Sequence, residues 1–262
     1  MIRKWPSRSD ELLLNVQSPY QWISLFKDGD HYWLDLNNSG SPQFHTKEAG
    51  LSHRYMIKLP LMMAKNVESI LIIGGGDGLA AKEALEFPDL KHITNVELDP
   101  VLCGLVKSHP LMRNISHDSF NHPKVKLTVG DGIKYLINTD KKYDVIIDDC
   151  DVDVTTQPGG ISANTYAMYL QCLLNKLTPG GIFCIMEALG SGEPSAFNYL
   201  GKMPSGKQER MVWLEDTLQK RNEIQDWQSL TPYITYAIID SPIGPEAFIY
   251  GSNKPMKIRR NY

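Results

Sequence analysis

Five short strand-like segments, separated by helix-like stretches, constrain the fold of this 262-residue chain more than any other feature. The first segment is apolar almost throughout, as expected of a strand buried on both faces of a sheet. The five segments span residues 69–73, 92–96, 125–129, 143–147 and 182–186. Strands that alternate with helices pair in parallel through right-handed crossovers. We therefore predict an α/β fold with a Rossmann-like, doubly wound, mostly parallel sheet.

The N-terminal region has a different pattern. Residues 20–36 contain two strand-like segments around a polar turn with a glycine, which is typical of a β-hairpin. We expect a small N-terminal β domain at residues 1–50 and a Rossmann-like domain at residues 51–262. Within the second domain we predict a first helix at 51–65, a helix at 165–177 that Pro179 and two glycines close, a long loop at 188–210, a helix at 211–228 and a late strand at 247–250.

Composition excludes several classes of partner. The formal net charge is -3 and the Lys and Arg residues are scattered, so we expect no nucleic-acid surface. No stretch approaches the roughly 20 apolar residues that a membrane helix needs, so we expect no membrane partner. The four cysteines form no CxxC pair and no histidine group has a ligand spacing, so we expect no metal and a reducing, cytoplasmic location.

The residues best suited to binding or catalysis stand at the ends of the predicted strands. In an open α/β sheet, ligands bind beyond the carboxyl ends of the strands. Four successive strand ends carry glycines and carboxylates, namely Gly74, Gly75, Gly76, Asp77 and Gly78, then Glu97 with Asp99, then Asp131, and finally Asp148, Asp149 and Asp151. This repetition predicts a single binding site formed by several strands.

The carboxylates favour a cationic ligand with a nucleoside part. Asp77 stands where a diphosphate would need backbone N–H groups without a negative charge, so it suits a sulfonium or an ammonium. Glu97 is placed to accept both ribose hydroxyls, unless it is a surface carboxylate at a strand end. Asp131 could accept from an adenine amino group or could simply form a turn. The aspartates at 148–151 repel one another unless a cation lies between them or some point away, so we expect at least one to face the site.

At these positions the chain resembles the spermidine synthase family. The resemblance rests on LPL at 59–61 followed by ILIIGGGDG at 70–78, VELD at 96–99, GDG at 130–132 and YDVIIDD at 143–149. It extends to residues 18–21, 34–35 and 242–248 and so covers most of the chain. It implies a class I methyltransferase-like Rossmann fold, a homodimer, and a role in polyamine biosynthesis as an aminopropyltransferase. Such an enzyme moves the aminopropyl group of decarboxylated S-adenosylmethionine, its co-substrate, to a small-molecule amine and releases methylthioadenosine.

The resemblance also implies roles for individual residues. Asp149 would orient the attacking amine and help to remove its proton. Glu97 would hold the ribose and Asp131 the adenine, while Asp77 would pair with the ammonium of the aminopropyl group. The pocket of the co-substrate would further include Gln21, Gln43, Gly74, Gly75, Gly76 and Gly132.

The acceptor side departs from the family pattern. A tyrosine of the family falls at Ser52, with His53 beside it, and the second aspartate of its DSSDP motif falls at Val152. Asp151 or Asp153 could replace that aspartate. We expect a putrescine-like diamine as acceptor, with a longer, branched or aromatic amine as an open alternative.

Two other functions remain open from the sequence. The first is a methyltransferase that uses intact S-adenosylmethionine, although Asp77 and Asp149 would repel the carboxylate of that cofactor. The second is a non-catalytic homologue that binds a polyamine or a nucleoside.

Overall fold

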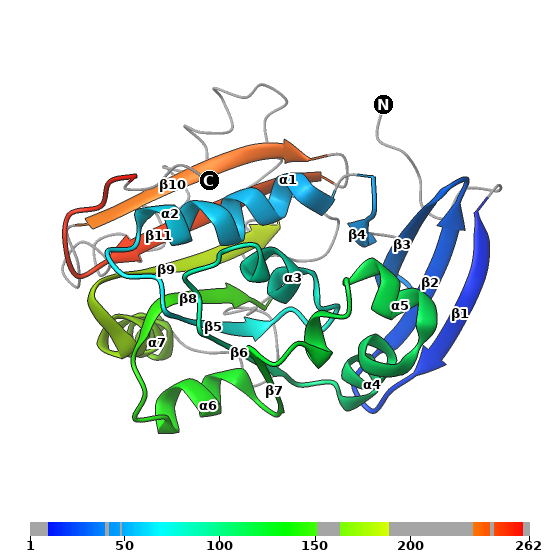
Figure 1. The fold of residues 1–262 in the computed structure, drawn as a ribbon, viewed down its shortest axis with the longest axis horizontal. Helices are drawn as coiled ribbons and strands as arrows, with labels where there is room; N and C mark the ends of the chain where they lie inside the picture. Colours follow the sequence, from blue (N-terminus) through cyan, green and yellow to red (C-terminus); the bar gives the residue numbers. More distant parts are fainter. Residues whose placement is uncertain are drawn as a thin grey trace.

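The computed structural model describes residues 10–39, 42–47, 49–150, 163–188, 233–241 and 244–258. Two sheets stand side by side within these residues, a small one and a large one (Figure 1). The small sheet has the strand order β1-β2-β3-β4, and the large sheet has the order β10-β11-β9-β8-β5-β6-β7. The division of the chain into domains at 1–50 and 51–262 stays a prediction.

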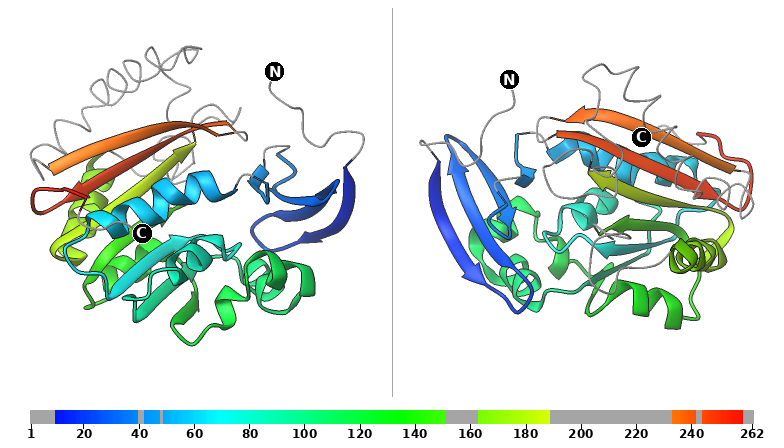
Figure 2. Two further views of the ribbon diagram at one scale, coloured as in Figure 1. Left: turned by 45° about the horizontal axis from the view of Figure 1, so that its top comes forward. Right: turned by 180° about the vertical axis from the view of Figure 1, so that it is seen from behind.

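The small sheet is antiparallel throughout. It consists of β1 (Glu11–Gln17), β2 (Trp22–Asp28), β3 (His31–Leu36) and β4 (Pro42–His45). The predicted hairpin is confirmed as β2 and β3, whose register pairs Asp28 with His31 across a two-residue turn. The sequence did not indicate β1, because most of its side chains are exposed and lack a clear inward-facing alternation. Figures 1 and 2 show this sheet beside helices α4 and α5.

The large sheet confirms the predicted fold class. Its parallel strands are β5 (Ser69–Gly74), β6 (His92–Glu97), β7 (Val125–Val129), β8 (Tyr143–Asp149) and β9 (Leu177–Ala188). The strands β10 (Tyr233–Ser241) and β11 (Gly244–Ser252) join antiparallel beside β9. The late strand predicted at 247–250 is therefore the central part of β11.

One predicted boundary in the large sheet is wrong. The strand predicted at 182–186 begins already at Leu177, directly after the helix predicted at 165–177, which ends at Lys176. Leu177 pairs with Tyr143, and the register then shifts so that Ile182 pairs with Val145. The residues between them are absorbed as an irregularity in the strand, at which Gly180 adopts a positive φ of 86°.

The helices cover both faces of the large sheet. A continuous helical segment, predicted at 51–65, consists of α1 (Ala49–His53), a π-helical turn η1 (Arg54–Lys58) and α2 (Leu59–Met63). This segment shares one face and one apolar core with α3 (Leu79–Leu85), α4 (Pro100–Ser108) and α5 (Pro110–Ile115). The opposite face packs on α6 (Gly132–Asn138) and α7 (Ala163–Lys176). A 3-10 turn, η2 (Ser119–Asn121), precedes β7.

Two further expectations concern other parts of the chain. The predicted helix at 211–228 and nearly all of the loop predicted at 188–210 lie outside the described residues. Among the helices that are described, none is long and apolar enough to cross a membrane.

Candidate active site

The glycine loop after β5 lies directly against two of the predicted carboxylates. In the parallel register, Gly74 is paired with Asp149, the last residue of β8. A Cβ atom on Gly75 would lie 3.1 Å from Oδ2 of Asp149, and a Cβ on Gly76 would lie 2.6 Å from Cγ of Glu97. The close approach at Gly76 requires a residue without a side chain, because carbon atoms in contact are normally about 3.5–4.0 Å apart. The loop therefore brings Asp149 and Glu97 to one edge of the sheet.

Glu97 is held at this edge by the backbone that follows it. Its Oε1 accepts a hydrogen bond of 2.8 Å from the backbone N–H of Asp99. Burial raises the pKa of Glu97, and the charges of Asp99 and Asp77 raise it further, while backbone hydrogen bonds oppose the shift. A buried carboxylate with a raised pKa is stabilised in its ionised form by hydrogen-bond donors or by a cation.

Asp77 lies close enough to Glu97 and Asp149 for its charge to raise the pKa of both carboxyl groups. Its Oδ1 accepts a 2.8 Å hydrogen bond from the backbone N–H of Leu79, which fixes the carboxylate at the start of α3. Burial raises the pKa of Asp77, and the nearby His53 on α1 partly lowers it. His53 is itself only 7% exposed. The helix α1 contacts α3, whose first turn follows Asp77, so α1 lies at the edge of the same site.

The two aspartates at the end of β8 have different surroundings. Asp148 is buried and accepts a 2.5 Å hydrogen bond from the hydroxyl of Tyr169 on α7 and a 3.2 Å bond from the N–H of Cys150. Asp149 points to the opposite face of the sheet, where its carboxylate lies against Gly75. Burial raises the pKa of Asp149 well above its usual value, with further contributions from the charges of Asp77, Asp148, Glu97 and Glu246. Asp149 is therefore the aspartate of β8 that belongs to the group of strand-end carboxylates.

Four further residues predicted for the co-substrate pocket lie in different parts of the structure. Gln21 donates from Nε2 to Oδ2 of Asp99 at 2.9 Å, and Asp99 in turn caps α4, so the loop before β2 is tied to the end of β6. Asp131 caps α6 by accepting from the N–H of Lys134 at 3.0 Å and keeps a partly exposed side chain. Gly132 begins α6 next to Ile73, whereas the side chain of Gln43 on β4 is exposed.

Ser52, predicted for the acceptor side, contacts a buried carboxylate that the sequence analysis missed. Ser52 on α1 donates from its hydroxyl to Oε2 of Glu246 on β11 at 2.5 Å, across 194 residues of sequence. Both side chains are buried, with exposed fractions of 8% and 6%. A single carboxylate near the start of an otherwise apolar strand was the signal that could have identified Glu246. The predicted acceptor residues Asp151 and Asp153 lie outside the described residues.

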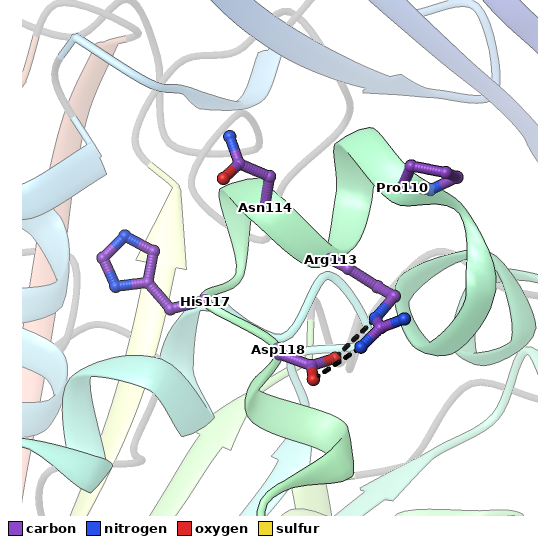
Figure 3. Close-up of a pocket in the computed structure, with 5 residues that line it drawn as sticks. All are labelled: Pro110, Arg113, Asn114, His117 and Asp118. Atoms are coloured by element: carbon purple, nitrogen blue, oxygen red, sulfur yellow. Dashed lines mark hydrogen bonds and ion pairs between the residues drawn. The ribbon is translucent and has the colours of Figure 1, made fainter.

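A surface depression elsewhere on the molecule is separate from these carboxylates. It has a volume of about 520 Å³ and is lined by residues of α5 and the turn after it, namely Pro110, Arg113, Asn114, His117 and Asp118. Figure 3 shows that the cation of this depression, Arg113, faces Asp118, with hydrogen bonds of 2.7 and 2.8 Å. Arg113 and Asp118 pair with each other in this depression, and none of the strand-end carboxylates lines it. Within the described ranges, no group of three or more His, Cys, Asp or Glu side chains is arranged to hold a metal ion.

The sequence of the chain has many relatives of known family. A model of the spermine/spermidine synthase domain matches residues 50–193, which is more than half of the chain. Polyamine aminopropyltransferase 2 of Aquifex aeolicus is 35% identical over 175 residues, which cover 66% of this chain and 34% of that protein. The polyamine aminopropyltransferase of Escherichia coli O1:K1 is 30% identical over 176 residues, which cover 66% of this chain and 58% of that protein. The chain thus spans between about a third and three fifths of these curated relatives.

Solved structures agree in fold. A spermidine synthase in complex with the transition-state analogue AdoDATO superposes with a TM-score of 0.69 at 17% sequence identity, over 93% of this chain and 72% of that chain. The spermidine synthase of Thermotoga maritima superposes with a TM-score of 0.68 at 18% identity over the same shares. Together with the carboxylates gathered around the glycine loop, the match over residues 50–193 establishes that the chain belongs to the spermine/spermidine synthase family.

Proposed function

We propose that this protein is an aminopropyltransferase of polyamine biosynthesis, which moves the aminopropyl group of decarboxylated S-adenosylmethionine to an amine. The observation that carries the proposal is the convergence of Asp77, Glu97 and Asp149 around the glycine loop. Three carboxylates in one partly buried site repel one another, so the site is completed by a ligand with positive charge. A sulfonium with a terminal ammonium and an amine acceptor together supply that charge.

The co-substrate fits the donor side of the site. Glu97 keeps Oε2 beside Gly76, while its other oxygen is held by Asp99, so it is placed to accept from ribose hydroxyls. Asp77 accepts from the backbone N–H of Leu79 through Oδ1 and would pair with the ammonium of the aminopropyl group through Oδ2. Asp131 would receive the adenine amino group on the outer edge. Gln21 and Gln43 would complete this pocket from the small sheet.

The transfer requires alignment and the removal of one proton. The lone pair of a neutral amine attacks the carbon next to the sulfonium, the carbon–sulfur bond breaks, and the sulfur keeps the electron pair as a neutral thioether. The new ammonium then loses a proton, which Asp149 would accept. The raised pKa of Asp149 suits this role, because a base is most effective when its pKa lies near the working pH.

The decisive experiment measures products with two cofactors in parallel. The protein is incubated with decarboxylated or intact S-adenosylmethionine and a panel of di- and polyamines, and both methylthioadenosine and S-adenosylhomocysteine are quantified. We expect release of methylthioadenosine, only with the decarboxylated co-substrate and most rapidly with a putrescine-like diamine. Asp149→Asn should lower transfer by about 10²- to 10⁴-fold and leave methylthioadenosine binding nearly unchanged. Turnover with intact S-adenosylmethionine alone would identify a methyltransferase, and nucleoside binding without turnover would identify a binding protein.

We also propose a cytoplasmic location and a homodimer. All four cysteines are free thiols, which fits a reducing compartment. The small sheet and the turn between β1 and β2 expose several apolar side chains that a second copy could cover, namely Leu12, Leu13, Tyr20 and Trp22. Light scattering of the purified protein tests the dimer, and substitution of Leu12 by Glu should shift it toward a monomer.

A further inference from the structure

The carboxylate of Glu246 stands at the same edge of the sheet as the proposed catalytic aspartate. Because β11 runs antiparallel to β9, its first residues lie beside the carboxyl end of β9, where Glu246 is paired with Ala188. Asp148 on β8 is paired with Ile185 of the same strand, so Asp149 lies near the level of Met186. The registers therefore place Glu246 two strands away from Asp149 and two residues farther toward the carboxyl end of β9.

The two carboxylates also share a face of the sheet. Side chains alternate along a strand, so Asp149 lies on the face of Val145 and Ile147, and Glu246 lies on the face of Phe248 and Tyr250. All four of these apolar side chains belong to one core, the one that packs beneath the segment α1–η1–α2. With about 4.8 Å between strands and about 3.3 Å per residue, the Cα atoms of Asp149 and Glu246 are roughly 12 Å apart. A short diamine fits between two carboxyl groups at this spacing, since both side chains extend from the same face.

Three contacts fix the helical segment over β11. The first is the hydrogen bond from Ser52 to Glu246. In the second, the ring of Tyr55 stacks on Phe248 with 5.9 Å between centroids. In the third, the hydroxyl of Tyr250 donates to the carbonyl of Tyr55 at 2.9 Å. Glu246 is thus held in place by a rigid element.

Neighbouring residues of α1 serve opposite sides of the site. Ser52 contacts Glu246, while His53 acts electrostatically on Asp77. In the strand order, β11 and β6 lie on opposite sides of β8, so Glu246 and Glu97 lie on opposite sides of Asp149. Glu97 is the residue proposed to hold the ribose, so Glu246 lies on the side away from the nucleoside.

We propose that Glu246, held by Ser52, determines acceptor specificity by binding the distal ammonium of a diamine or longer polyamine whose other nitrogen attacks at Asp149. The inference rests on the proposed aminopropyl transfer and adds to it the class of acceptor. A monoamine lacks the second charge and would form no ion pair with Glu246. The protein should therefore discriminate strongly between a diamine and a monoamine of the same chain length.

The test compares putrescine with butylamine in the wild-type protein and in Glu246→Gln, which keeps the shape of the side chain and removes its charge. Equilibrium binding of each amine is measured by calorimetry in the presence of saturating methylthioadenosine, so that this readout does not depend on turnover. The kcat/KM of transfer to each amine is measured separately. The control variant Glu83→Gln removes another buried carboxylate, which lies on α3 and pairs with Lys58 of η1 at 3.0 Å.

We expect Glu246→Gln to weaken putrescine binding by at least about tenfold and to change butylamine binding by less than about twofold. Ser52→Ala should give an intermediate loss, and Glu83→Gln should match the wild type. Equal losses for both amines, or none for putrescine, would overturn the assignment of Glu246. Transfer that proceeds normally with an unchanged preference for putrescine would also reject it while leaving the proposed reaction intact. Selective loss of putrescine binding without any turnover would support Glu246 and refute the transferase.

Discussion

The substitution Gly76→Ala tests the link between the glycine loop and nucleoside binding. The new Cβ would lie 2.6 Å from Cγ and 2.7 Å from Cδ of Glu97. Since carbon atoms in contact are about 3.5–4.0 Å apart, the side chain of Glu97 must retreat by about 1 Å. The φ of Gly76 is not among the positive values found for glycines of this loop, so the backbone itself accepts alanine.

The displacement of Glu97 should weaken nucleoside binding. The hydrogen bond of 2.8 Å from Asp99 to Oε1 would stretch beyond the normal limit, and the carboxylate would leave the position proposed for the ribose hydroxyls. Loss of a hydrogen bond to a charged group costs about 1.5–3 kcal/mol. We therefore expect methylthioadenosine to bind roughly 10- to 100-fold more weakly to Gly76→Ala, as measured by titration calorimetry.

The chain offers a matched control for this experiment. Gly104 lies within α4, and a Cβ there would meet no atom within 4 Å. Gly104→Ala should therefore leave affinity unchanged and stabilise the fold by about 0.5–1 kcal/mol. In a Glu97→Ala background, Gly76→Ala should cost almost no further affinity, because the clash is gone. Wild-type affinity in Gly76→Ala alone would refute the assignment of Glu97 to the nucleoside.

Three more outcomes follow from buried groups. Because the folded pKa of Asp149 is raised, the ionised carboxylate destabilises the fold as pH rises from its usual value of 3.8 through the raised one. Asp149→Asn should therefore melt at a higher temperature than the wild type at pH 8, and parallel melting curves across pH would contradict this. Asp144 accepts from the N–H of Glu68 at 2.9 Å and from the hydroxyl of Thr178 at 2.7 Å. Asp144→Ala should therefore lower the free energy of unfolding, measured by urea denaturation, by about 2–4 kcal/mol. A loss under about 1 kcal/mol would show that these hydrogen bonds are dispensable. Burial raises the pKa of Cys103 to about 12, so iodoacetamide at pH 8 should modify it only after unfolding, as mass spectrometry can detect; rapid labelling of the native protein would count against its burial.

The sequence predicted the part of the site that local pattern controls. Strands β5, β6 and β8 are apolar segments with glycines or carboxylates directly after them, so both the strands and the convergence of Asp77, Glu97 and Asp149 could be expected from order alone. The strand pattern alone did not show which aspartate of β8 faces the site, and Asp149 was named only through the family resemblance. Which aspartate faces the site depends on which side of the sheet the α1 segment covers, and tertiary packing decides this.

The sequence could not predict the contribution of the antiparallel strands. Glu246 comes from the beginning of a strand, whereas the search for site residues followed strand ends. Only the antiparallel direction of β11 brings it to the common edge, and no local pattern states that direction. The helix predicted at 51–65 was correct in kind, but its π-helical turn at Arg54–Lys58 has no sequence signal that we can identify.

The position of β11 has a consequence for the order in which the protein assembles. This strand is the last of the described chain, yet it pairs with β9 on one side and with β10 on the other. During synthesis, β5 to β9 can therefore form the donor half of the pocket while β9 is still an open edge. The proposed acceptor half forms only after β11 has paired with β9 and Glu246 has contacted Ser52, which precedes it by 194 residues in the chain. We expect the ability to bind a nucleoside to appear before the ability to choose an amine.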